Sequence, residues 1–135
     1  MIARVATRSY LLDTHAVIWA LDRPEALSAA ARNAASTGPN VLSVVSYWEV
    51  MAKSMKGTLD VGDPRLWWRE AVEQLAATIL PLRPEHVAAV FGLSPIHKDP
   101  FDRILIAQAA VEGLALVSMD AEIARYGSEG LRVVG

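Results

Sequence analysis

Short apolar runs recur along the chain, and each is too short to form a buried helix. They span residues 9–12, 41–45, 78–82, 114–118 and 131–134, and longer segments with helical patterns separate them. Strands buried on both faces have this continuous apolar character, and strands that alternate with helices form parallel sheets. The pattern predicts an α/β fold, with an open, doubly wound parallel sheet, right-handed crossovers and flanking helices. Residues 2–5 offer an alternative extension of the first strand.

The segments between these runs carry the signals that begin and end helices. Asp63-Pro64 and Asp99-Pro100 each combine an acidic N-cap with a proline at the first helical position, and Gly57 and Gly113 follow two helix ends. The Gly38-Pro39 pair separates a helix from the second strand. The expected helices cover residues 15–21, 25–36, 47–56 behind an N-cap at Ser46, 64–77, 84–93, 100–112, and a short stretch after Asp120.

Residues 97–109, HKDPFDRILIAQA, place a carboxylate inside an apolar helix. Asp102 lies beneath its helical neighbours Leu105 and Ile106, so it does not belong to a solvated face. No cation three or four residues further along the helix neutralises it, and a buried carboxylate without a partner is costly. Asp99, three residues earlier, is assigned mainly to capping the helix. We therefore hypothesise that the partner of Asp102 is a metal ion.

Further carboxylates fall where the predicted sheet would bring them to Asp102. Asp13 follows the first strand, Asp120 lies just past the fourth strand, and Glu49 is expected in the first turn of the helix after the second strand. In open parallel sheets the working crevice lies beyond the carboxyl ends of the strands. A set of oxygen ligands without His or Cys suits Mg²⁺ or Mn²⁺, and a pair of such ions hydrolyses phosphodiesters in other enzymes.

Each acid also has a structural interpretation when taken alone. Asp13 and Asp120 could be simple N-caps, and Asp102 with Asp99 resembles a capping box. Glu49 precedes Lys53 by four residues, which is typical of a surface ion pair on a helix. The joint placement of the acids favours the metal site.

Other polar and aromatic residues carry weaker signals. The histidines lack metal-ligand spacing and are expected to serve packing or to lie on the surface, and the adjacent tryptophans are expected in the core or at a subunit contact rather than stacked on bases. Basic residues flank the acids and could bind phosphate, although solvated charge is the default. These residues are His15, His86, His97, Trp67, Trp68, Lys53, Lys56, Lys98, Arg103 and Arg125.

The bulk properties restrict the function classes. A chain of 135 residues with 53% hydrophobic residues is expected to form a single domain over residues 1–135 with a substantial core. The absence of cysteine excludes disulfides and thiolate chemistry and agrees with a reducing cytoplasm. A net charge of −2 argues against general polyanion binding. The sequence shows no signal peptide and no apolar run long enough to span a bilayer.

The chain resembles the PIN-domain ribonucleases, in particular the VapC-type toxins of prokaryotic toxin–antitoxin pairs. The segments LLDTHAVIWAL, SYWEV, HKDPFDRILIAQA and LVSMD carry the resemblance, which spans residues 9–134. It implies a PIN-like fold with strand order 3-2-1-4-5 and hydrolytic, Mg²⁺- or Mn²⁺-dependent RNA cleavage. By position, Asp13, Glu49, Asp102 and Asp120 match the family's acidic quartet, and Thr14 and Ser118 match hydroxyl residues beside the metal.

The resemblance also implies partners. These are RNA as substrate, a second copy of the chain in a homodimer, and a VapB-type antitoxin whose C-terminal tail covers the active site, with larger toxin–antitoxin assemblies built from them. Lys53, Lys56 and Arg103 are the candidate RNA contacts, and Asp99 is expected to support the metal site from behind. The extension 1–8 departs from relatives that begin directly with the first strand, which leaves the start codon open.

Rival interpretations fit less well. A phosphoacceptor receiver domain needs adjacent acids after its first strand and a late lysine, whereas Thr14 follows Asp13 and no lysine follows Lys98. Neither a P-loop nor a dinucleotide-binding glycine motif is present. A nuclease that acts on DNA or structured nucleic acid stays open, because the same carboxylates serve either polymer. A non-catalytic PIN-like interaction module also stays open, although the chain keeps all four acids.

Overall fold

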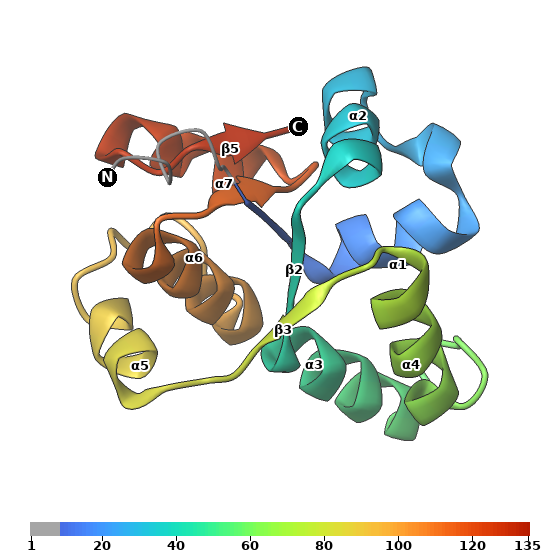
Figure 1. Ribbon diagram of the computed structural model, residues 1–135. Helices are drawn as coiled ribbons and strands as arrows, with labels where there is room; N and C mark the ends of the chain where they lie inside the picture. The colour runs from blue at the N-terminus through green and yellow to red at the C-terminus, as the bar shows by residue number, and fades with distance from the viewer. Residues whose placement is uncertain (1–8) are drawn as a thin grey trace.

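The computed structural model describes residues 9–135 and contains a parallel sheet flanked by helices on both faces (Figure 1). The strand order is β3-β2-β1-β4-β5, as predicted, and every pairing is parallel. The strands are β1 (Tyr10–Leu12), β2 (Asn40–Ser43), β3 (Thr78–Leu80), β4 (Ala115–Val117) and β5 (Val133–Val134). The order reverses between β1 and β4, so the crevice expected in such sheets lies beyond the carboxyl ends of these two strands.

The helices cover the sheet in two groups. In Figure 1, α5 and α6 lie on one side and α1, α2 and α4 on the other. The helices are α1 (Thr14–Asp22), α2 (Ala29–Thr37), α3 (Val44–Met55), α4 (Pro64–Gln74), α5 (Pro84–Val90), α6 (Pro100–Glu112) and α7 (Ala121–Ala124), with 3₁₀ helices at Pro24–Ala26 and Arg125–Glu129. No helix in the part of the chain that the structure describes is long and apolar enough to cross a membrane.

Successive side chains of the central strands pack on opposite faces of the sheet. Leu12 and Val117 enter a core with α1, α2 and α4, whereas Leu11 and Leu116 enter a second core with α6 and α7. All four side chains are fully buried. A strand turns successive side chains to opposite faces, so two helical layers remove both sets from water. The central strands therefore form a rigid base from which the loops at their carboxyl ends project.

The boundary between β2 and α3 differs from the prediction. The strand was expected through Val45 with Ser46 as the N-cap, but the helix begins at Val44 and Ser43 is its N-cap. The Ser43 hydroxyl accepts a hydrogen bond from the Val45 N–H at 3.0 Å and donates to Gln108 Oε1 of α6 at 2.5 Å. This second bond comes from a distant helix, so the local pattern of valines and serines did not reveal it.

Several helices are shorter than predicted. The helix expected over 25–36 is a 3₁₀ turn followed by α2, because Leu27 is extended and Ser28 caps the new helix by accepting from the Ala31 N–H. The fourth helix ends at Gln74, before Ala76 adopts a left-handed conformation with φ 47°. The fifth ends at Val90, three residues early. The possible strand extension 2–5 and the segment 1–8 lie outside the described residues.

Candidate active site

The sheet brings the predicted acids to one edge, beyond the carboxyl ends of β1 and β4. Asp13 directly follows β1, and Asp120 follows β4 after two residues. Asp102 lies in the first turn of α6, and Glu49 lies in the second turn of α3 rather than the first, because α3 starts earlier than expected. Burial, followed by the nearby charges of Asp99 and Glu49, raises the pKa of Asp102 to about 7. The acids are therefore close enough to disfavour one another's charge.

Asp13 is both a helix cap and a member of this acidic group. Its Oδ1 accepts a hydrogen bond from the Ala16 N–H at 2.8 Å and caps α1. The residue is only 4% exposed, and burial raises the pKa of its carboxyl although a hydrogen bond from the Ser118 hydroxyl lowers it. The capping interpretation and the site interpretation are therefore compatible, because Asp13 caps α1 and also lies near enough to Asp120 for that charge to raise its pKa.

The two carboxylate oxygens of Asp120 have different partners. Oδ1 accepts from the Glu122 N–H at 2.8 Å and caps α7, while Oδ2 lies 2.9 Å from Nε2 of His97. Partial burial alone would raise the pKa of Asp120, but the hydrogen bonds from His97 and Glu122 lower it. Ser118, expected beside the site, accepts from the Asp120 N–H at 3.1 Å. The turn after β4 thus holds Asp120 from both its backbone and its side chain.

Asp99 serves capping, as predicted. Its Oδ1 accepts from the N–H groups of Phe101 and Asp102 at 2.8 and 3.2 Å. Since these bonds fix the first turn of α6, Asp99 also sets the position of Asp102.

Glu49 is almost fully buried and has two partners. The Thr14 hydroxyl donates to Glu49 Oε1 at 2.6 Å and also lies 2.9 Å from the Ser46 hydroxyl. The Lys53 ammonium donates to Oε2 at 2.6 Å, which confirms the ion pair considered from the sequence. Lys53 therefore lies against the acids as their counter-charge and not as a free phosphate contact.

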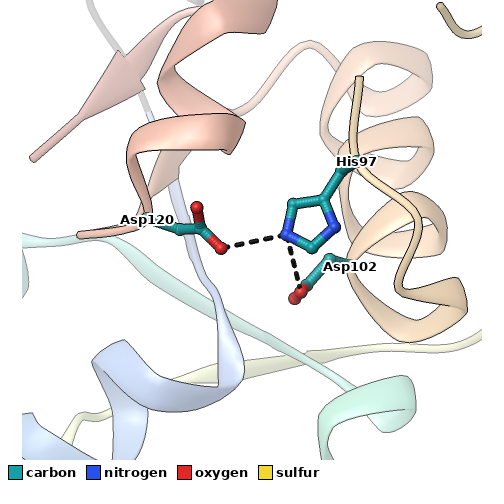
Figure 2. Close-up of side chains that lie close together, drawn as sticks. All are labelled: His97, Asp102 and Asp120. Carbon is teal, nitrogen blue, oxygen red and sulfur yellow. Dashed lines mark hydrogen bonds and ion pairs between the residues drawn. The ribbon is translucent and has the colours of Figure 1, made fainter. Parts of the chain in front are cut away.

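His97 was missed as a site residue, because the sequence suggested only packing or surface exposure. It is buried, and its Nε2 lies 2.9 Å from Asp120 Oδ2 and 3.2 Å from Asp102 Oδ2 (Figure 2). These ligand atoms all lie within 4.8 Å of one another. The available signal was its position two residues before the N-cap Asp99, in the segment that already carried Asp102.

Arg103 has a different place from the predicted RNA contact. Its guanidinium donates to the backbone carbonyls of Ser94 and His97 at 3.1 and 3.0 Å, and to those of Val90 and Leu93 at longer range. It therefore fixes the connection between α5 and α6. Lys56, Lys98 and Arg125 are exposed.

The remaining residues singled out from the sequence lie mostly outside the site. Trp68 belongs to the core and stacks on Tyr47 with ring centroids 4.8 Å apart, and Trp67 packs beside it. His86 is fully buried and bonded to Glu112 at 2.7 Å. His15 is exposed and lies against Trp19 at the rim of the acidic pocket.

An open pocket of about 300 Å³ lies at the edge of the sheet where the aspartates meet. It is lined by Asp13, His15, Trp19, Asp102, Met119 and Asp120. A neighbouring hollow of about 220 Å³ reaches Glu49 and Lys53. The donor chemistry fits a hard divalent cation, because the carboxylates supply oxygen ligands and their crowded charge would be relieved by a positive ion. Asp13, Glu49, Asp102 and Asp120 are the residues that could hold it.

Comparisons with known proteins agree on the fold. The PIN domain family matches residues 10–129. Ribonuclease VapC22 of Mycobacterium tuberculosis is 27% identical over 115 residues, which cover 84% of this chain and 88% of that protein.

Solved structures show the same architecture at low identity. VapBC2 from Rickettsia felis, bound to a DNA fragment from its promoter, has a TM-score of 0.62 at 14% identity and covers 92% of this chain and 96% of that chain. DNA-bound VapBC from Salmonella typhimurium has a TM-score of 0.63 at 15% identity, and the match covers 94% of this chain and 97% of that chain.

The raised pKa of Asp102 predicts that the stability of the metal-free protein depends on pH. Between pH 3.8 and about 7 the unfolded chain ionises this carboxyl before the folded protein does, so the free energy of unfolding falls as the pH rises. In EDTA, urea unfolding should give a lower free energy at about pH 8 than at about pH 5.5.

In the Asp102→Asn variant, the free energy of unfolding should differ much less between these two pH values, because the asparagine side chain does not ionise. Asp22→Asn, which alters an exposed carboxylate away from the site, should keep the full difference of the native protein. An Asp102→Asn variant with unaltered pH dependence would show that the carboxyl ionises freely in the folded state.

Proposed function

Because the chain belongs to the PIN domain family, we propose that it is a metal-dependent endoribonuclease and the toxin of a toxin–antitoxin pair. The single observation that carries the proposal is the convergence of Asp13, Asp102 and Asp120 on one pocket at the sheet edge, with Glu49 in the neighbouring hollow and close enough to raise the pKa of Asp102. The name of its relative, Ribonuclease VapC22, supports RNA as the substrate. Activity in the cytoplasm, where RNA and a small antitoxin are available, follows from the same proposal.

The proposed roles of the residues follow from their contacts. Asp13 and Asp120 would hold Mg²⁺ or Mn²⁺ through the oxygens that their capping bonds leave free, and Asp102 through a carboxyl that caps no helix. Glu49 would complete the set from α3. The bound cation supplies Lewis acidity for a water nucleophile and offsets charge on the scissile phosphate. Thr14 holds the Glu49 carboxylate in place, and Ser118 bonds the Asp13 carboxylate and accepts from the backbone N–H of Asp120.

The central test is the Asp13→Asn variant, in which the capping oxygen and the volume are kept and one charge is deleted. RNA cleavage should fall by more than about 100-fold, since loss of an outer-shell partner alone costs about 10- to 100-fold. In EDTA the variant should gain stability, on the order of 1 kcal/mol, because a raised pKa measures how costly the charge is. Mg²⁺ should stabilise the native protein and the variant much less.

The measurements are thermal melting in EDTA and in Mg²⁺, and cleavage of RNA beside single-stranded DNA of the same sequence. Native protein that cuts RNA equally well in excess EDTA would refute the metal requirement, and preferential cutting of the DNA would refute the assignment of RNA. A variant with full activity and an undiminished response to Mg²⁺ would reduce Asp13 to a helix cap.

A homodimer is the second part of the proposal. Its expected contact is not the tryptophan pair, because Trp68 belongs to the core and Trp67 packs against that core. Exposed apolar side chains lie on α3, on β3 at the edge of the sheet, on α5 and on the residues that flank α5; they are Val44, Trp48, Ile79, Leu82, Val87 and Phe91. Phe91 is 97% exposed. Large exposed apolar surfaces of this kind are typical of protein interfaces.

Phe91→Glu should convert the dimer to a monomer without loss of folding, because the side chain contributes nothing to the core. Sedimentation at micromolar concentration is the measurement. Leu66→Glu provides a matched control, because Leu66 is also exposed but lies on α4, which packs in the other helical layer, and it should leave the dimer intact. A native protein that sediments as a monomer, or an unaffected Phe91→Glu dimer, would contradict this interface.

The third part is a VapB-type antitoxin that covers the acidic pocket. The two solved relatives described above are VapBC complexes. We expect the partner to present an arginine to the pocket, because a guanidinium fork can bridge two carboxylates and replace the charge of the metal.

A small protein encoded beside this one, co-expressed with it, should form a stable complex and inhibit RNA cleavage. A structure of that complex should show a basic side chain against Asp13 and Asp102. A complex that leaves both carboxylates open to solvent would defeat the expected mode of inhibition.

A further inference from the structure

His97 stands between two of the acids without belonging to the expected quartet. Its ring reaches Asp102 and Asp120 from the connection that precedes α6, and the two carboxylates converge on the same nitrogen, Nε2 (Figure 2). Two chemical roles fit this position. Either Nε2 is a third ligand for a cation held by the two aspartates, or Nε2 carries a proton and donates hydrogen bonds to both carboxylates.

The other ring nitrogen decides between these roles. The backbone N–H of Asp99 points at Nδ1 of His97 at 3.2 Å, so Nδ1 accepts a hydrogen bond. A neutral imidazole carries one proton, and a nitrogen that accepts a hydrogen bond cannot hold it. The proton is therefore on Nε2, which faces the carboxylates as a donor. In this tautomer Nε2 has no lone pair available for a metal.

Hydrogen bonds hold the backbone of His97 in place although the segment around it has no regular secondary structure. The His97 N–H donates to the Tyr126 hydroxyl at 3.0 Å, and that hydroxyl donates to the Ser94 carbonyl at 2.7 Å. The Arg103 guanidinium donates to the carbonyls of both Ser94 and His97. Since Tyr126 is itself buried in the core, these bonds tie the position of His97 to the body of the fold.

We propose that His97 is a positioning residue whose Nε2–H bridges Asp102 and Asp120 and holds them ready for a divalent cation without binding that cation. The inference rests on the proposed metal site. The Asp120 side chain is 39% exposed and, among residues 9–135, is otherwise held only by its capping bonds at the start of α7, so it can turn away from Asp102 when the donor is lost. Metal affinity then falls although every carboxylate is still present.

The first test compares His97→Leu with His97→Gln. Leucine fills much of the space but removes the donor, whereas the glutamine amide can donate from nearly the same position. Calorimetric titration with Mn²⁺ should show affinity reduced by about 10- to 100-fold in His97→Leu, the range found for loss of an outer-shell partner, and largely restored in His97→Gln. Unchanged affinity in a folded His97→Leu variant would overturn the proposal, and so would equal losses in both variants.

The second test observes the ring itself and does not depend on any variant. The ¹⁵N chemical shifts of the His97 side chain, measured by NMR near neutral pH, should report the Nε2–H tautomer both without metal and with saturating Mg²⁺. A proton on Nδ1, or loss of the Nε2 proton when Mg²⁺ is added, would identify His97 as a ligand and refute the positioning role.

The two tests separate this inference from the proposed function. Native protein that binds neither Mn²⁺ nor Mg²⁺ would remove the metal site, and with it the proposed nuclease mechanism. Native protein that binds Mn²⁺, with His97→Leu binding equally well, would leave the proposed function standing and remove only the role of His97.

Discussion

Hydrogen bonds from helix N-termini hold the negative charge of this site in place. Asp13, Asp99 and Asp120 each accept a hydrogen bond from the first turn of a helix, at α1, α6 and α7. The unpaired N–H groups and the positive end of the helix dipole stabilise a carboxylate there. Because the doubly wound sheet starts these helices at one edge, the caps that begin them also concentrate acids in one pocket. The fold and the site therefore share the same residues.

Asp102 is the exception, and this makes it the sensitive member of the group. It lies inside the first turn of α6, where its own N–H is a donor to Asp99, and its carboxyl has no capping bond. Burial and the surrounding acids therefore act on it with little compensation, and its pKa rises to about 7. Lys53 offsets the charge of Glu49, and the His97 Nε2–H stabilises Asp102 and Asp120 by hydrogen bonding. A divalent cation would complete this compensation, which is the physical basis of the proposed metal site.

The sequence was sufficient for features that local pattern determines, and insufficient where distant residues decide. The strands and the caps at Asp63, Asp99 and Asp120 were predictable, because strand ends and helix starts have short-range signals. The strand order came from the resemblance to the PIN-domain ribonucleases and not from local pattern. The start of α3 was not, since Ser43 and Ser46 are both acceptable caps and a bond from Ser43 to Gln108, 65 residues away, accompanies the choice. The roles of His97 and Arg103 depend on Tyr126 and on the turn after β4, which no spacing in residues 97–109 reveals.

Crystals of the protein soaked in Mn²⁺, with anomalous diffraction recorded from the metal, test the central claim most directly. The account predicts anomalous density in the pocket between the carboxylates of Asp13, Asp102 and Asp120, with oxygen ligands and with His97 Nε2 outside the coordination shell. Absence of density at these carboxylates under saturating Mn²⁺ would contradict the claim that their convergence forms a metal site.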